Sequence, residues 1–192
     1  MTTFTENRIR QRAQRKTGDN RQAITVLKEE VASSKTKSSF DIFLSHSTSD
    51  AEIILGVKGV LEDHGKTVYV DWLEDPQLDR SHVTPATAEV IRGRMGQCRS
   101  LVYVHSANSG TSKWMPWEVG YFDGLKGAVA ILPVTRSGES FQGQEYLGIY
   151  PYLDEAPPQG RVTKEIWLNK SSIESKRWDS WISDPRAFRK TS

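Results

Sequence analysis

The stretch Phe40-Asp41-Ile42-Phe43-Leu44, followed by Ser45-His46-Ser47, decides the fold class of this chain. Four of its first five residues are apolar, a composition typical of a buried strand. The polar run from Ser45 to Asp50 then ends the strand. We therefore predict a strand over residues 40–44 whose carboxyl end carries serine and histidine side chains.

Apolar strands and amphipathic helices alternate along the chain after this strand. Further strands are predicted over residues 67–71, 100–104 and 128–134. The helices predicted between them are one with Ile53, Val57 and Leu61 on a single face that ends at Gly65, one that starts at Thr84-Pro85, and one capped by Ser112 over residues 113–125. This alternation predicts an α/β fold in which a parallel sheet has helices on both faces and right-handed crossovers.

The signal is weaker outside this central part. Residues 137–152 are predicted to be a loop with glycines and aromatic residues, residues 164–168 a final edge strand, and residues 173–182 a closing helix. Before the first strand, residues 20–31 are predicted to form a short helix and residues 32–39 a polar linker.

The length of 192 residues fits one domain of ordinary size with segments to spare at both ends. We divide the chain into a basic, partly helical arm and linker over residues 1–38, a domain with a C-terminal elaboration over residues 39–183, and a tail over residues 184–192. The arm carries nine Lys or Arg against four Asp or Glu, although the whole chain has a net charge of only +2. Such an arm can contact nucleic acid or an acidic partner, but charge alone favours a solubilising role, and we do not expect nucleic acid as a partner.

Composition and motifs exclude several function classes. The single cysteine, Cys98, is incompatible with a disulfide framework or a cysteine-rich zinc site, and the four histidines lack a metal-binding spacing, so we expect no metal. No apolar run approaches the ~20 residues of a membrane helix, and the first residues lack the apolar core of a secretory signal, which predicts a soluble, cytoplasmic protein. No phosphate-binding loop, dinucleotide fingerprint or nucleophile elbow is present.

Polar and aromatic side chains follow the predicted strands where each strand ends. Ser45 and His46 follow the first strand, Asp71 and Trp72 the second, and His105 the third. In an open parallel sheet, ligands bind beyond the carboxyl ends of the strands. We therefore expect these five residues to line a substrate-binding site, although Asp71 also suits the ordinary role of ending a strand at a turn.

The most unusual stretch is Ser112-Lys113-Trp114-Met115-Pro116-Trp117-Glu118. It places the carboxylate of Glu118 in the first turns of a helix, together with two tryptophans that could stack on a flat ring of a ligand. The alternative is a helix start with a favourable acidic residue and aromatic side chains in the core. Both alternatives are compatible with the sequence.

Taken together, these residues resemble a TIR domain, the Toll/interleukin-1 receptor fold. Four boxes carry the resemblance, at residues 40–47, 65–71, 98–106 and 112–118. The chain is most similar to the bacterial TIR proteins of anti-phage defence, including Thoeris-type subunits. The resemblance implies a flavodoxin-like, doubly wound parallel sheet with the strand order 2-1-3-4-5.

The resemblance also implies an activity. Many TIR domains cleave NAD between nicotinamide and ribose and release linear or cyclic ADP-ribose, so NAD is expected as substrate and no cofactor is required. A glutamate near the nicotinamide ribose is essential in these enzymes. In Thoeris-like members it corresponds to Glu118, and in many others to a position nearest to Glu89. Because Glu89 lies off the apolar face of its predicted helix, an ordinary surface charge is the alternative there, and we rank Glu118 ahead of it.

The same resemblance implies partners and leaves two other functions open. TIR domains associate with one another, so self-association is expected, together with an effector protein that responds to the product. The chain could instead be a TIR interaction module without catalysis, or could process another nucleoside through the same carboxylate chemistry.

Overall fold

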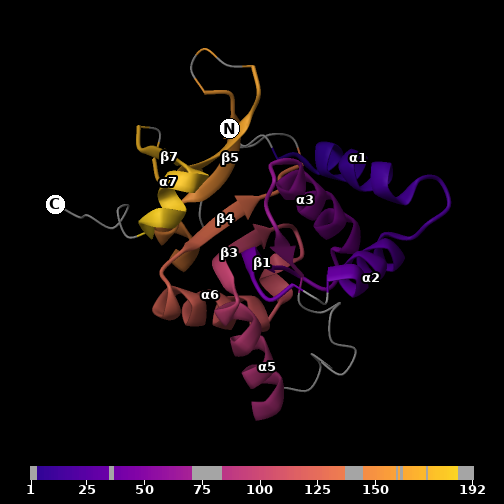
Figure 1. The fold of residues 1–192 in the computed structure, drawn as a ribbon, viewed down its shortest axis with the longest axis horizontal. Helices are drawn as coiled ribbons and strands as arrows, with labels where there is room; N and C mark the ends of the chain where they lie inside the picture. The colour runs from indigo at the N-terminus through magenta and orange to yellow at the C-terminus, as the bar shows by residue number, and fades with distance from the viewer. Residues whose placement is uncertain are drawn as a thin grey trace.

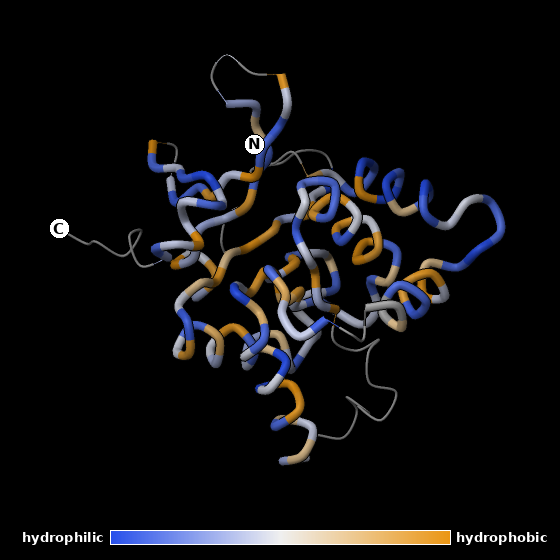
Figure 2. The backbone as a smooth tube through the Cα atoms, viewed as in Figure 1, coloured by the Kyte–Doolittle hydropathy of each residue, from blue (hydrophilic) through white to orange (hydrophobic). Residues whose placement is uncertain are grey.

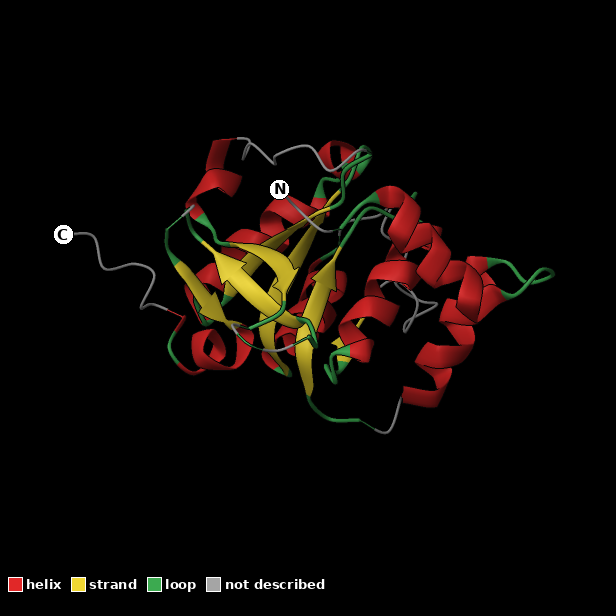
Figure 3. Cartoon of the chain, turned by 90° about the horizontal axis from the view of Figure 1, so that it is seen from above, coloured by secondary structure: helices red, strands yellow, loops and turns green. Residues whose placement is uncertain are grey.

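The computed structural model describes residues 4–34, 37–70, 84–136, 145–158, 160, 162–171 and 173–185. Within these residues, one sheet of seven strands lies between layers of helices (Figures 1 and 3). The strands are β1 Phe40–Ser45, β2 Val68–Tyr69, β3 Cys98–His105, β4 Val129–Pro133, β5 Tyr152–Ala156, β6 Glu165–Asn169 and β7 Ser175–Arg177. The helices are α1 Glu6–Thr17, α2 Ala23–Ser34, α3 Ala51–Asp63, α5 Pro85–Gly96, α6 Trp114–Leu125 and α7 Trp178–Ser183, with short 3-10 turns η1 Ser109–Thr111 and η2 Glu145–Ile149.

The sheet has the predicted topology. Its order is β2-β1-β3-β4-β5-β6-β7, and the first five strands in this order are parallel, so the expected arrangement 2-1-3-4-5 is confirmed. β6 and β7 extend the sheet in the antiparallel sense. The fold is therefore α/β and flavodoxin-like, as expected of a TIR domain, and ligands are expected at the edge where the parallel strands end.

The core lies along the central strands. Ile42, Phe43 and Leu44 of β1 are fully buried, and every residue of β4 is buried. Apolar residues follow these strands in Figure 2, whereas the outer turns of α1 are largely hydrophilic. Strands covered by helices on both faces need continuous apolar runs, and such runs are why these strands could be predicted from the sequence.

The C-terminal third differs from the prediction in two ways. Residues 152–156 form β5, a strand that was not predicted. The predicted edge strand at residues 164–168 is β6, and β7 lies outside it at the edge of the sheet. The helix predicted over residues 173–182 is wrong in its first half, because residues 175–177 pair with β6 and the helix begins only at Trp178. Antiparallel pairing with the neighbouring strand β6 outweighs local helical spacing here.

The N-terminal segment packs on the sheet domain. α1, which was not predicted, lies against α3, and α2 covers residues 23–34 rather than 20–31 (Figure 1). Phe4 and Ile9 are fully buried. The backbone of Thr135, just beyond β4, donates to the carbonyl of Phe4 at 3.1 Å and accepts from the amide of Glu6 at 2.8 Å. The basic segment therefore contributes to the core and reaches the carboxyl edge of the sheet.

Side-chain hydrogen bonds mark the starts of α5 and α6. The predicted start of α5 is confirmed, because the Thr84 hydroxyl accepts from the amide of Thr87 at 3.1 Å and Pro85 occupies the first turn. At α6 the N-cap position falls on Lys113, although the Ser112 hydroxyl still accepts from the amide of Met115 at 3.4 Å. No helix in the described residues has the length and apolar character needed to cross a membrane.

Candidate active site

The neighbouring strands β1 and β3 end side by side. Ser45, the last residue of β1, lies in parallel register with Tyr103 of β3. Two loops leave from this edge: one runs from His46 to Asp50 and leads into α3, and the other follows His105 and leads through η1 into α6. The predicted gathering of polar side chains at the carboxyl edge thus has a structural basis.

Glu118 is brought to this edge by α6. The helix begins at Trp114, so Glu118 lies slightly more than one turn into it, and the residue is fully buried. The hydroxyl of Ser45 donates to Oε2 of Glu118 at 2.6 Å. Removing a carboxylate from water is costly unless it is hydrogen-bonded, and a short hydrogen bond to a charged acceptor is among the stronger ones. Ser45 therefore stabilises and orients the buried glutamate.

Helical spacing separates the two tryptophans of this segment. Trp114 lies four residues before Glu118 and shares its face of α6, where it is 9% exposed. Trp117 lies four residues before Tyr121 and stacks on it, with ring centroids 5.6 Å apart at 18°. The two indoles still meet edge to face at 5.4 Å. Trp114 thus accompanies the buried glutamate, whereas Trp117 belongs to the outer face of the helix.

Tyr103 is a member of this site that the sequence did not single out. Burial, and to a smaller extent the charge of Glu118, raises the pKa of its hydroxyl, while a hydrogen bond with Ser109 opposes the rise. The hydroxyl therefore stays protonated at neutral pH. Its sequence signal was limited to an aromatic residue two positions before His105, on the same side of the strand.

The predicted histidines lie at the same edge. His46 is fully buried, and its Nδ1 lies 2.7 Å from the carbonyl oxygen of Leu44. His105 ends β3 and is partly exposed, and its carbonyl accepts from the amide of Val134 at 2.8 Å. The predicted residues Asp71 and Trp72 lie outside the described residues.

Glu89 lies elsewhere. Its side chain is 77% exposed on α5 and pairs with Arg92 at 3.2 Å. The guanidinium of Arg92 lies over the rings of Trp117 and Tyr121, at 5.6 and 5.8 Å from their centroids. The structure therefore groups Glu89 with a surface cluster of a cation and aromatic rings, and separates it from the buried pair of Ser45 and Glu118.

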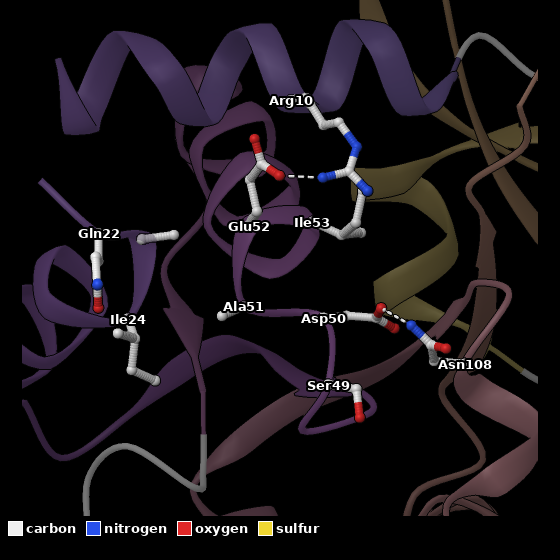
Figure 4. A pocket seen from close by; sticks show the side chains of 10 residues that line it. Arg10, Gln22, Ile24, Ser49, Asp50, Ala51, Glu52, Ile53 and Asn108 are labelled. Carbon is white, nitrogen blue, oxygen red and sulfur yellow. Dashed lines mark hydrogen bonds and ion pairs between the residues drawn. The ribbon is translucent and has the colours of Figure 1, made fainter. Parts of the chain in front are cut away.

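A polar hollow of about 350 Å³ opens beside the loop that follows β1 (Figure 4). Asp50 lies in its wall and bonds to Ser106 and Asn108 from the loop after β3. On the other side, Arg10 of α1 pairs with Glu52 of α3 (Figure 4). In the sequence Asp50 only ends a polar run, and no residue near it indicates these contacts.

The chemical groups at this edge suit a substrate that develops positive charge. A buried carboxylate held by a hydroxyl can stabilise such charge at close range, because few water molecules screen it. Among the described residues, no group of three or more histidine, cysteine or acidic side chains could hold a metal ion.

Fold and site together define this chain as a TIR-type α/β domain with a buried glutamate beyond the carboxyl ends of β1 and β3. No family model matches the chain. It is 44% identical to a protein of Bacillus cereus strain MSX-D12 named "Probable 3' cyclic ADP-D-ribose synthase ThsB'", over 95% of this chain and 98% of that protein. It is also 31% identical to a protein of Cytobacillus dafuensis named "Putative cyclic ADP-D-ribose synthase TIR2", over 45% of this chain and 23% of that protein. The chain belongs to the Thoeris-type bacterial TIR proteins.

Proposed function

We propose that this chain cleaves the bond between nicotinamide and ribose in NAD and closes the remaining ADP-ribose into a ring, in the setting of anti-phage defence. The observation that carries the proposal is the fully buried Glu118, held by Ser45 at the ligand-binding edge of the sheet. The similarity to the Bacillus cereus protein, which extends over nearly the whole chain, supports the same reaction.

Bond cleavage follows from the charges involved. When the bond between the ribose carbon and the nicotinamide nitrogen breaks, its electron pair stays with the nitrogen and neutralises the cationic ring. Positive charge then builds on the ribose, as in glycoside hydrolysis, and a nearby carboxylate lowers the energy of that state. Nicotinamide leaves without a strong general acid, because its nitrogen is already cationic. We assign the stabilising carboxylate to Glu118.

Ring closure uses a second part of the same substrate. A hydroxyl of the adenosine ribose attacks the cationic carbon, a C–O bond forms, and the hydroxyl proton is released. The products are nicotinamide, cyclic ADP-ribose and one proton. The name of the Bacillus cereus relative points to the 3' hydroxyl as the attacking group. Attack by water instead would give linear ADP-ribose.

Burial of Glu118 sets a condition on this reaction. The residue is 0% exposed, so side chains that cover it must move before a ribose can reach the carboxylate. We propose that self-association of this chain supplies that change, and that the cyclic product acts on a separate effector protein. The first of these proposals predicts that activity per molecule rises with protein concentration.

The direct test compares Glu118→Gln with Glu89→Gln on NAD. Glutamine preserves the shape of Glu118 and removes its charge, so nicotinamide release should fall by about 100- to 1000-fold, the usual cost of losing one electrostatic stabiliser. Glu89→Gln is the matched control and should keep the parent rate, because its side chain is exposed on α5. Nicotinamide and the sugar product are resolved by chromatography and mass, at low and at high protein concentration.

Two outcomes would contradict these proposals. Loss of activity in Glu89→Gln but not in Glu118→Gln would overturn the assignment of the glutamate. Intact NAD at every protein concentration, and also in extract of phage-infected cells, would overturn the proposed reaction and favour an interaction module.

A further inference from the structure

Asp50 occupies the N-cap position of α3 without capping the helix. Its side chain makes no hydrogen bond to the amides of the first turn, although aspartate in this position usually does. Both carboxylate oxygens instead accept from the loop that follows β3. The Ser106 hydroxyl donates to Oδ2 at 2.5 Å. Nδ2 of Asn108 donates to Oδ1 at 2.6 Å (Figure 4). Asp50 is only 7% exposed, so these contacts are largely shielded from water.

The loop that Asp50 holds is the one that leads into α6. It is braced internally, because the Ser109 hydroxyl donates to the carbonyl of Ser106 at 2.9 Å and accepts from its amide at 3.3 Å. The turn η1 starts at Ser109, and α6 begins at Trp114. The position of this short loop therefore sets where the first turns of α6 lie.

The same loop also contacts the buried site directly. The Ser109 hydroxyl is hydrogen-bonded with Tyr103, which lies in register with Ser45. Ser45 in turn donates to Glu118. Asp50 is thus connected to the glutamate by two routes: through the loop to Tyr103, on the strand beside Ser45, and through the loop into α6, which carries Glu118.

We propose that Asp50 is a positioning residue for the reaction at Glu118, an inference that rests on the proposed NAD chemistry. Asp50 fixes the loop after β3 against the loop after β1, and so fixes the carboxylate of Glu118 relative to Ser45. A displacement of about 1 Å at a reacting group can cost about 100-fold in rate. Loss of this connection should therefore lower kcat, while KM for NAD changes little, because the proposed role of Asp50 involves no contact with NAD.

The pairing of Asp50 with Asn108 permits an exchange experiment. Asp50→Asn removes the charge and turns one of the two accepting oxygens into a donor, so it can no longer accept from both Ser106 and Asn108. Asn108→Asp places one carboxylate against another. Each change should lower kcat by about 10- to 100-fold. The double exchange Asp50→Asn with Asn108→Asp restores a carboxylate facing an amide, and should bring kcat back to within about fivefold of the parent, since contacting residues are coupled. Glu52→Gln is the matched control: it removes a carboxylate from the same hollow and should leave kcat unchanged, because Glu52 pairs with Arg10.

The outcomes separate the two proposals. A parent chain that leaves NAD intact contradicts the proposed reaction itself. An active parent with Asp50→Asn at the parent kcat overturns the positioning role. A folded double exchange, checked by thermal unfolding, that stays as inactive as the single variants overturns it as well. If Asp50→Asn does not fold, the comparison of Asn108→Asp with the double exchange decides.

Discussion

The surroundings of Glu118 come from two segments that are far apart in the sequence. The helical spacing of residues 114–118 places it on the same face as Trp114, and this much follows from the sequence. Its hydrogen bond comes from Ser45, which lies 73 residues earlier in the chain. The choice between Glu118 and Glu89 could not be made from spacing alone. The structure shows one fully buried beside Ser45 and the other exposed beside Arg92.

At the residue scale we predict the effect of Ser45→Ala. The change removes the hydroxyl that donates to Glu118 and should cost about 1–3 kcal/mol in the free energy of unfolding, because a buried charged group loses a donor. The rate of nicotinamide release should fall by about tenfold, the rate equivalent of losing one hydrogen bond to the reacting carboxylate. Thermal unfolding and the NAD assay measure both effects.

Ser47→Ala is the control for this change. Ser47 is similarly buried in the same loop, but within the part of the chain that the structure describes its hydroxyl makes only a 3.4 Å contact with the amide of Ser49. Equal losses in the two variants would show that the loop, rather than the contact with Glu118, is sensitive to substitution.

At the element scale, the contact between α1 and α3 depends on a glycine. A Cβ atom added at Gly56 would lie 2.1 Å from the carbonyl oxygen of Ile9 and 2.7 Å from its Cγ2. The two helices therefore approach more closely than any larger residue permits. This approach lets Ile9 and Ala13 enter the core.

Gly56→Ala should accordingly separate α1 from α3. We expect a loss of about 1–3 kcal/mol in the free energy of unfolding, typical of overpacking. Gly93→Ala, in the interior of α5, is the matched control because no atom of the described residues lies within 4 Å of its added Cβ. It should stabilise the chain by up to about 1 kcal/mol, since alanine favours a helix. A Gly56→Ala chain as stable as the parent would contradict the close packing of the two helices.

At the scale of the whole molecule, carboxylates join the N-terminal helices to the rest of the fold. Glu30 of α2 accepts from Lys16 of α1 and Lys58 of α3, both at 2.7 Å. Glu155 of β5 accepts from Arg8 at 2.5 Å and lies 3.0 Å from Nε2 of His64. These contacts connect segments separated by up to 147 positions in the sequence.

These contacts predict how stability depends on pH. Burial alone would raise the pKa of Glu30 and of Glu155, but the hydrogen bonds and charges of their basic partners outweigh it, so both pKa values are lowered. A carboxyl whose pKa is lowered on folding stabilises the fold above its unfolded pKa of about 4.3, and this stabilisation is lost as the pH falls through the lower native value.

We therefore expect the melting temperature to change little between about pH 6 and 7 and to fall steeply below about pH 4.5. Thermal unfolding across this range measures the dependence. Glu155→Gln should flatten the acid side of the curve, because it removes one of these groups. A parent chain equally stable at pH 3 and pH 7 would contradict the proposed linkage.

The sequence by itself determined the central fold of this protein. Apolar runs and faces are local to a segment, so they could be recognised without the structure. They predicted the strands β1, β3 and β4 and the helices α3, α5 and α6. The parallel order, the edge at which a site lies and the presence of Glu118 in that region followed from the same patterns and from the resemblance.

Only the tertiary structure decided which segments contact one another. It paired β7 with β6, placed α1 on α3, brought Ser45 to Glu118 and joined Asp50 to Asn108. None of these contacts has a local signal, because strand pairing, close helix packing and buried hydrogen bonds are fixed by which surfaces meet when the whole chain folds. For the same reason the sequence left two candidate glutamates, Glu118 and Glu89. The packing of α6 against β1 buries Glu118, whereas Glu89 is exposed on α5.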